Sequence, residues 1–182
     1  MTAAFVYLLL VAALVVRVRM EGGSRPVPIL PGPGEPVWLV RVHHVLLLLI
    51  LAGAPLERLV FHGAAAGRAA GAALFGSGVV LYRLAGRALG PALSPFVEPR
   101  PGVALVTRGL YRYLRHPMYL SQALIAVGAP LTLGCRLTLA LAVPALLVLT
   151  LRTWREEQAL ARTFPEYARY AAETARILPF VC

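Results

Sequence analysis

Apolar residues along the chain fall into five segments, separated by short polar stretches rich in arginine. The segments run from Ala3 to Val16, Trp38 to Ala54, Ala69 to Leu84, Pro117 to Leu133 and Leu137 to Leu151. Several are shorter than the roughly 20 residues that a helix needs to cross a bilayer, so their boundaries are soft. The pattern predicts an all-α, polytopic integral membrane protein with about five transmembrane helices and short C-terminal helices.

Composition agrees with a membrane protein. Of the 182 residues, 59% are hydrophobic, a larger share than in ordinary soluble domains. The chain contains no aspartate or lysine, which excludes mechanisms that need an Asp triad, an Asp dyad or a Schiff-base lysine. Its two cysteines, Cys135 and Cys182, follow no metal-binding spacing, so we expect no metal site from them.

Arginine alone supplies the basic charge, and its distribution predicts an orientation. The 18 Lys+Arg residues are all arginines near the ends of apolar runs, which indicates membrane orientation and not nucleic-acid binding. Five spans with the N-terminus outside place every arginine in the cytoplasm except Arg58, Arg68 and Arg136. We therefore expect the N-terminus outside, the C-terminus inside and a site facing the cytoplasm.

The segment Arg115 to Tyr119 marks the start of the fourth predicted span. Proline favours the first turn of a helix, so Pro117 should begin it and leave Arg115 and His116 at the interface. The N-terminal end of a helix carries a partial positive charge, and with Arg115 beside it this end suits a carboxylate or another anion. A plain membrane anchor is the alternative interpretation of Arg115.

Glu156 and Glu157 follow one hairpin later, on the same side of the membrane. They offer a complementary site for an ammonium or sulfonium cation, and the rings of Tyr111, Tyr113 and Tyr119 add faces for a cation. An anion site, a cation site and aromatic faces together match the methionine part of S-adenosylmethionine. Arg152 and Glu156 also have the spacing of an ordinary (i, i+4) ion pair on a helix surface.

Three further patterns predict structure more than chemistry. Small residues in the third segment, among them Gly67, Gly71 and Gly78, favour helix packing within the monomer over a dimer face. Adjacent histidines point about 100° apart on a helix, so His43-His44 is a poor metal site. After Leu151 the chain becomes amphipathic, and Pro165 with a capping-box spacing from Thr163 to Glu166 predicts two short cytoplasmic helices.

The C-terminal half resembles a known family. The run LVTRGLYRYLRHPMY from Leu105 to Tyr119, Glu156-Glu157, and FPEY from Phe164 to Tyr167 resemble the isoprenylcysteine carboxyl methyltransferase family, which is akin to membrane phospholipid N-methyltransferases. Where many relatives have Gly-Pro-Tyr, this chain has Gly109-Leu110-Tyr111. The resemblance implies a single membrane domain over residues 1–182, with accessory transmembrane helices in 1–85 and a methyltransferase core in 86–182.

The resemblance also implies roles for individual residues. Cofactor-binding residues carried over by position are Leu105, Val106, Tyr111, His116, Pro117 and Tyr119, and we assign Glu157 with them. The residues assigned to catalysis are Arg115, Arg152 and Glu156. Which of the two glutamates contacts the cofactor is left open.

The expected activity is methyl transfer from S-adenosylmethionine to a lipophilic, membrane-partitioned small substrate that enters from the bilayer, as in the isoprenylcysteine carboxyl methyltransferases. A phospholipid-amine or small-thiol methyltransferase is the alternative within the same class. A non-catalytic membrane scaffold or small transporter is the alternative from another class, but transporters tend to place ionisable groups near the middle of spans.

Overall fold

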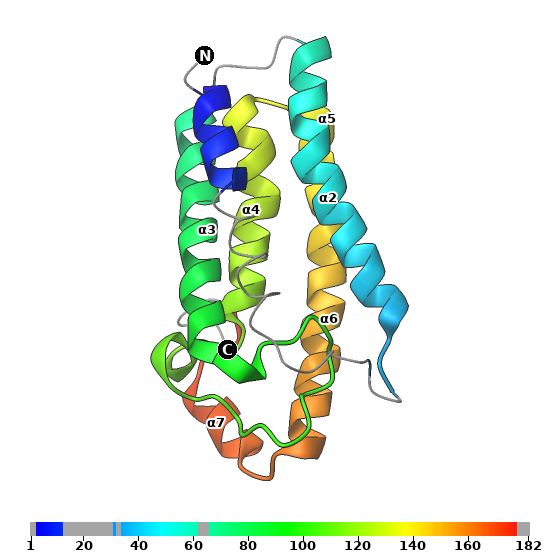
Figure 1. The fold of residues 1–182 in the computed structure, drawn as a ribbon, viewed down its shortest axis with the longest axis vertical. Helices are drawn as coiled ribbons and strands as arrows, with labels where there is room; N and C mark the ends of the chain where they lie inside the picture. Colours follow the sequence, from blue (N-terminus) through cyan, green and yellow to red (C-terminus); the bar gives the residue numbers. More distant parts are fainter. Residues whose placement is uncertain (1–2, 13–30, 32–33, 62–65, 178–182) are drawn as a thin grey trace.

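The structure, a computed structural model, describes residues 3–12, 31, 34–61 and 66–177, and long antiparallel helices dominate it (Figure 1). The helices are α2 (Val37–Val60), α3 (Arg68–Leu89), α4 (Pro117–Leu133), α5 (Arg136–Ala140), α6 (Ala142–Thr163) and α7 (Tyr167–Glu173), with the 3-10 turns η1 (Gly90–Ala92) and η2 (Gly109–Arg112). A further helix covers Ala3–Ala12. Within the described residues no strand forms, so the all-α prediction is confirmed.

Each of the five predicted apolar segments meets a helix, but the helices differ in length. Three described helices are long and apolar enough to cross a membrane, namely Val37–Val60, Arg68–Ala92 and Arg136–Thr163. Ala3–Ala12 and α4 are apolar but shorter. Residues 13–16 of the first predicted segment lie outside the described residues. The multi-pass class is therefore supported, and the number of five spans stays a prediction.

Two predicted helix ends were too early. The third apolar segment stops at Leu84, yet α3 continues to Leu89. The helix contains no proline, and the first Gly-Pro pair that can end it is Gly90-Pro91. The last span was expected to end at Leu151, yet α6 continues to Thr163. The stretch after Leu151 consists of good helix formers, so the polar part of α6 extends the apolar part without a break.

The predicted capping box is also wrong. Thr163 is the last residue of α6, and its hydroxyl donates to the Ala159 carbonyl at 2.8 Å. Phe164 leaves the helical region at φ −118° and ψ 110°, as expected for the residue before a proline. The short helix α7 begins after Glu166 and has no side-chain cap at its N-terminus. The break at Pro165 is therefore confirmed, while the capping mechanism is not.

Close contact between α3 and α4 explains the small residues. A Cβ atom on Gly71 would lie 2.4 Å from the Thr132 amide nitrogen, and one on Gly128 would lie 2.4 Å from the Phe75 nitrogen. The glycines therefore let the two backbones approach each other inside one chain, as predicted. Gly67 takes no part in this contact, since a Cβ there would meet nothing within 4 Å.

The core lies where these two helices meet α2, α6 and the first helix. Ile50, Phe75 and Ile125 are fully buried there, and the Tyr7 ring packs on Phe75 with centroids 5.5 Å apart. Large apolar side chains also cover the outside of the bundle, for example Leu48 and Leu147. Such an outer surface is what a helix bundle in lipid requires.

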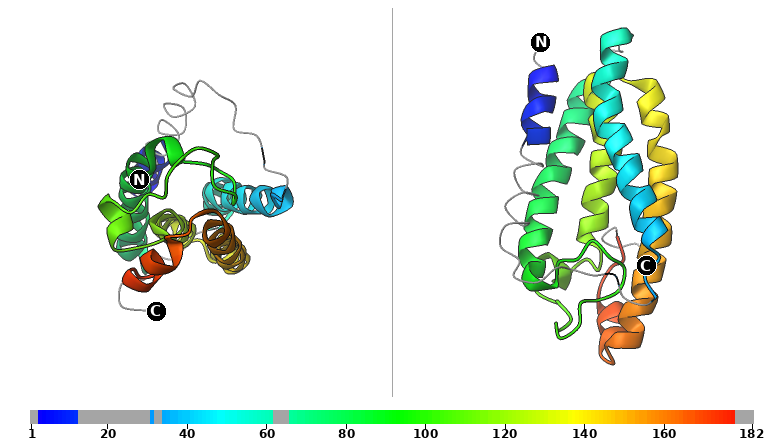
Figure 2. Two further views of the ribbon diagram at one scale, coloured as in Figure 1. Left: turned by 90° about the horizontal axis from the view of Figure 1, so that it is seen from below. Right: turned by 45° about the vertical axis from the view of Figure 1, so that its right-hand side comes forward.

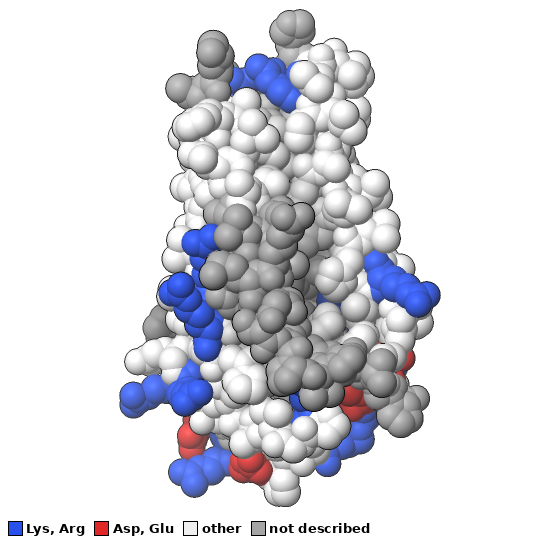
Figure 3. Space-filling model, in the orientation of Figure 1, with Lys and Arg blue, Asp and Glu red and all other residues white. Residues whose placement is uncertain are grey.

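Arginines collect at the two ends of the bundle. Arg58 lies in the last turn of α2, while Arg68 and Arg136 begin α3 and α5, so these three share the upper end in Figure 1. Figure 3 shows further basic side chains over the lower half and a mostly uncharged band between. Arg17, Arg19 and Arg25 lie outside the described residues. The loop between α3 and α4 crosses the lower end together with α7 (Figure 2).

Candidate functional site

The start of α4 is tied to the C-terminal segment. The helix begins at Pro117, as the sequence predicts. Immediately before it, the backbone amide of Arg115 donates to the Ala175 carbonyl at 2.8 Å, and that of His116 donates to the Arg176 carbonyl at 3.1 Å. These two hydrogen bonds hold the segment after α7 against the N-terminus of α4. They fix the position of that segment relative to α4 at the lower end of the bundle.

Glu157 is surrounded by basic groups. Its Oε1 lies 3.1 Å from Arg115 Nε and 3.3 Å from His116 Nε2, and its Oε2 lies 2.5 Å from Arg176 Nη2. The carboxylate is only one-fifth exposed. These three partners satisfy the carboxylate in this arrangement.

Arg115 is engaged on its other side as well. Its Nη1 donates to the carbonyl oxygens of Ala171 and Thr174, the second at 2.6 Å. The side chain therefore links the end of α7 to Glu157 on α6. An incoming anion would have to share Arg115 with these internal partners.

Two adjoining cavities open at this end of the bundle. The narrow one, of about 90 Å³, lies between the α3–α4 loop, the end of α6 and α7. The wider one, of about 430 Å³, reaches inward among α2, α4 and α6. They share a wall made by Ser94, Tyr111, Arg115 and Glu156. The wider volume lies in the usual range for small-molecule sites, and the narrow one extends it.

The residues predicted from the sequence divide between these cavities. Those that line the narrow cavity are Leu105, Val106, Tyr111, Arg115 and Glu156. Those that line the wider cavity are Tyr111, Arg115, His116, Tyr119, Arg152 and Glu156. Pro117 and Glu157 line neither. Tyr113, also considered as a ring face for a cation, is two-thirds exposed and lines neither cavity.

Arg152 does not form the surface ion pair that its spacing from Glu156 allowed. It is buried at 3% exposure, and its Nη2 donates to the Pro95 carbonyl at 2.7 Å. Its guanidinium carbon lies 5.4 Å from the centroid of the Tyr119 ring, and the Tyr119 hydroxyl lies beside both Arg152 and Glu156. Arg152 belongs to none of the ion pairs between described residues. It is therefore a buried cation facing a cavity.

Tyrosines stiffen the wall between α7 and the loop. The Tyr170 hydroxyl donates to the Tyr111 carbonyl at 2.7 Å. Burial raises the pKa of Tyr170 to about 12, and burial followed by the Glu156 charge raises the pKa of Tyr111 above its ordinary value. Both hydroxyls therefore keep their protons at neutral pH.

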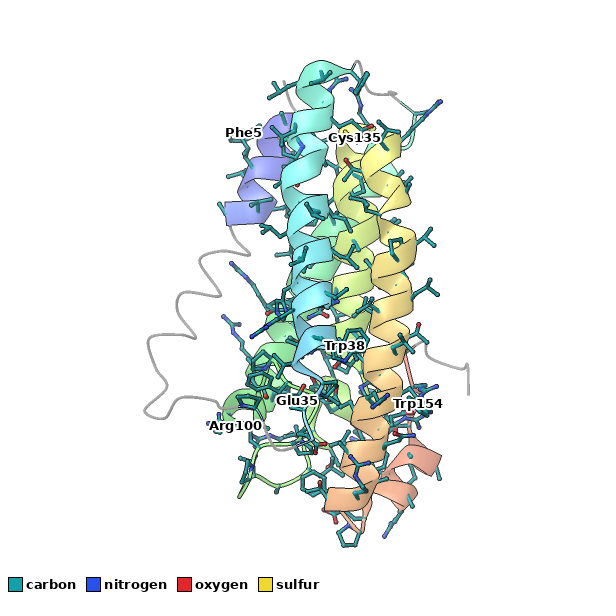
Figure 4. All side chains as sticks on the ribbon, turned by 90° about the vertical axis from the view of Figure 1, so that its right-hand side faces the viewer. Phe5, Glu35, Trp38, Arg100, Cys135 and Trp154 are labelled. Carbon is teal, nitrogen blue, oxygen red and sulfur yellow. The ribbon has the colours of Figure 1, made fainter. Side chains whose placement is uncertain are left out.

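Glu35 holds the loop that covers the narrow cavity. Its two carboxylate oxygens each accept from the Val97 amide at 3.0 Å, and Oε2 also accepts from the Glu98 amide at 2.9 Å. Figure 4 shows Glu35 just below the first turn of α2, beside the loop. The sequence did not point to this contact, because the partners are 62 positions apart.

Some polar residues of the wider cavity were not predicted as site residues, His43 and Gln122 among them. His43 had been weighed only as a metal ligand, and Gln122 was overlooked. A signal did exist for Gln122, since a polar side chain inside an apolar segment is a candidate functional residue. No group of three or more His, Cys or Glu side chains within the described part of the chain is placed to hold a metal ion.

A known family matches the part of the chain that carries the residues predicted for the site. The sequence model of the family described as phospholipid methyltransferase matches residues 66–167, which include every residue predicted for the site. The cobalt-zinc-cadmium resistance protein CzcN of Cupriavidus metallidurans is 36% identical over 87 residues, covering 46% of this chain. The match covers 39% of that protein, so the chain spans well under half the length of this relative.

Proposed function

Because this chain belongs to the phospholipid methyltransferase family, we propose that it transfers a methyl group from S-adenosylmethionine to a membrane-partitioned acceptor. The observation that carries the proposal is the pair of adjoining cavities with a common wall of Tyr111, Arg115 and Glu156. Methyl transfer needs two molecules side by side, and a shared wall lets one set of residues contact both.

The residues around the narrow cavity fit the proposed cofactor chemically. Apolar side chains such as Leu105 and Val106 suit a nucleoside, while the rings of Tyr111 and Tyr167 offer faces to a cation. Glu156 suits an ammonium group. When bound, the cofactor would supply a methyl group already activated on a sulfonium centre.

Glu156, and not Glu157, is the better candidate for contact with the cofactor. Glu156 lines both cavities, whereas Glu157 lines neither and is held by three basic groups. The sequence alone left this choice open, although it grouped Glu157 with the cofactor-binding residues. In the proposed arrangement Glu157 fixes Arg115, and Arg115 fixes the end of α7.

The protein's work in such a reaction is alignment and exclusion of water. The side chains of Tyr111, Tyr119 and Arg152 are all less than 10% exposed, so reactants between them are shielded from solvent. A carboxylate acceptor needs no base. An amine or thiol acceptor must lose a proton, and Glu156 at the common wall is the group placed to accept it.

An acceptor like that of the isoprenylcysteine carboxyl methyltransferases remains our first proposal, since the motif from Leu105 to Tyr119 resembles that family. A phospholipid amine is the second candidate, and the matched family description favours it. A small thiol is a third possibility within the class. A non-catalytic scaffold or transporter stays an alternative that an activity assay separates from all three.

We also propose that the lower end of the bundle, which holds both cavities, faces the cytoplasm. The arginines of the lower end outnumber Arg58, Arg68 and Arg136 at the upper end. Positively charged residues collect on the cytoplasmic side of membrane proteins. The C-terminal segment would then also be cytoplasmic.

Labelled S-adenosylmethionine tests the proposal directly. We expect purified protein in detergent to bind it saturably and to transfer label to at least one of a prenylcysteine, a phosphatidylethanolamine or a thiol. Glu156→Gln should weaken cofactor binding about tenfold or more, as expected for loss of a charge-assisted contact. Glu173→Gln is the matched control, because Glu173 is exposed and pairs with exposed Arg169.

Two results would overturn the proposal. One is the absence of saturable binding by the wild-type protein. The other is equal binding by the Glu156→Gln and Glu173→Gln variants.

A further inference from the structure

Three polar side chains, two of them buried, converge in the wider cavity from three helices. His43 comes from α2, Gln122 from α4 and Arg152 from α6. His43 is 2% exposed and Arg152 is 3% exposed. Among the described residues, neither ring nitrogen of His43, nor the Gln122 carbonyl oxygen, nor Arg152 Nε has a hydrogen-bond partner. We call these three residues the polar cluster.

Such an arrangement is costly without a ligand. Buried polar groups in native proteins are nearly always hydrogen-bonded, and a buried charge needs a counter-charge. Gln122 lies beside the His43 ring, but the two leave bonding capacity unused. Glu156 lines the same cavity and lies with Arg152 beside the Tyr119 hydroxyl, but among the described residues it forms no ion pair with Arg152. Within the cluster itself, no neighbour of Arg152 is an anion. The missing partner is therefore an anion that also accepts and donates hydrogen bonds.

A metal ion does not fit this cluster. Arg152 is close enough to His43 to interact with it electrostatically, and it would repel a metal cation held there. His44 lines the cavity too, but its Nδ1 is bonded to the Val40 carbonyl at 2.7 Å. The cluster therefore selects a negatively charged ligand.

Apolar side chains also line the cavity that holds the cluster. Leu47 on α2 and Met118 and Ile125 on α4 belong to this lining, and α2 carries exposed apolar side chains on its outer face. A ligand that places a charged head at the cluster can lay an apolar body along these side chains. This combination describes an amphiphile with an anionic head group.

We propose that the polar cluster is the head-group subsite for the methyl acceptor and selects a lipid-anchored anion, with Arg152 binding the charge and His43 and Gln122 bonding the remaining polar atoms. The inference rests on the proposed methyltransferase function. Its new content is that His43 and Gln122 determine acceptor specificity. His43 lies outside the residues matched by the family model, so this contribution belongs to the chain's own α2.

Acceptor binding without cofactor is the appropriate test, since it does not depend on turnover. Full-length protein in neutral detergent is titrated with four probes. An N-acetylated prenylcysteine with a free carboxylate is paired with its methyl ester, and a phosphatidic acid is paired with a diacylglycerol. We expect one anionic probe to bind at least about tenfold more tightly than its neutral counterpart. The pair that shows the difference identifies a carboxylate or a phosphate as the anion.

Variants then locate the binding site. His43→Phe and Gln122→Leu should each weaken binding of the preferred anionic probe by about tenfold, with cofactor affinity unchanged. Gln122→Glu should abolish discrimination, because the new carboxylate would occupy Arg152. Gln158→Leu is the control, because Gln158 is exposed and lines neither cavity, and it should bind like wild type. Equal unfolding temperatures would show that each variant is folded, and Gln122→Glu decides the outcome if His43→Phe fails to fold.

The subsite is refuted if anionic and neutral probes bind equally, or if the His43 and Gln122 variants bind the anionic probe like wild type. Failure of the proposed function appears differently, as a wild-type protein that does not bind S-adenosylmethionine.

Discussion

Replacing Gly71 by alanine should destabilise the bundle, although alanine favours helices. The added Cβ would lie 2.4 Å from the Thr132 nitrogen and 2.5 Å from the Leu131 carbonyl carbon. Optimal contacts between such atoms are about 3.5–4.0 Å, so α3 and α4 must separate by about 1 Å. Forced overpacking of this kind costs about 1–3 kcal/mol, which outweighs the gain of about 0.5–1 kcal/mol from removing a helical glycine.

Gly76→Ala is the matched control on the same helix. A Cβ at this position meets no heavy atom within 4 Å, so the substitution should be neutral or stabilising by up to about 1 kcal/mol. Gly128→Ala should resemble Gly71→Ala, since its Cβ would lie 2.4 Å from the Phe75 nitrogen. Because both glycines are in one contact, their effects in the double variant should not add.

Equilibrium unfolding in mixed detergent micelles measures these differences. Methyl transfer should fall together with stability in the Gly71 and Gly128 variants, because α4 carries Tyr119 and Gln122 into the cavity. Equal unfolding free energies for Gly71→Ala and Gly76→Ala would refute the close contact between α3 and α4.

Three further predictions concern the lower end of the bundle. Glu157→Gln should loosen the segment after α7 and cost about 1–3 kcal/mol, seen as faster proteolysis there, whereas protection like that of wild type would contradict its anchoring role. Glu35→Gln should weaken cofactor binding by releasing the α3–α4 loop, with Glu173→Gln as control; equal affinities would argue against it. Tyr170→Phe should cost about 0.5–1.5 kcal/mol through the lost bond to Tyr111. Since the folded-state pKa of Tyr170 is raised to about 12, its stabilising contribution is present below pH 10 and lost as pH rises toward 12. Stability should therefore fall less steeply over that range in Tyr170→Phe, and an unchanged slope would contradict this.

Local patterns predicted most of the helices because their causes are local. Pro117 begins α4 since proline suits the first turn of a helix, and Gly134 at φ 73° ends it. The ends of α3 and α6 were missed because hydrophobicity marks the part of a helix that lies in lipid. A helix continues through polar residues until its hydrogen bonding is interrupted, which happens at Gly90 and before Pro165.

The candidate site was predicted in part. Arg115, His116 and Tyr119 stand together at one helix start, so a short motif was enough to find them. Glu35 and His43 were missed because the groups that surround them come from distant segments. A contact such as that of Glu35 with Val97 depends on how a loop folds back over the bundle, and no local spacing encodes it.

The glutamate pair shows where the two kinds of information divide. The sequence by itself determined that Glu156 and Glu157 lie at the same end of the bundle as Arg115, because helix length and arginine sidedness follow from local composition. Adjacent residues on a helix point about 100° apart, so only one of the pair can face the cavities. The rotation of α6 about its axis decides which one. That rotation is set by packing against α2 and α4, and it turns Glu156 toward the cavities and Glu157 toward its basic partners.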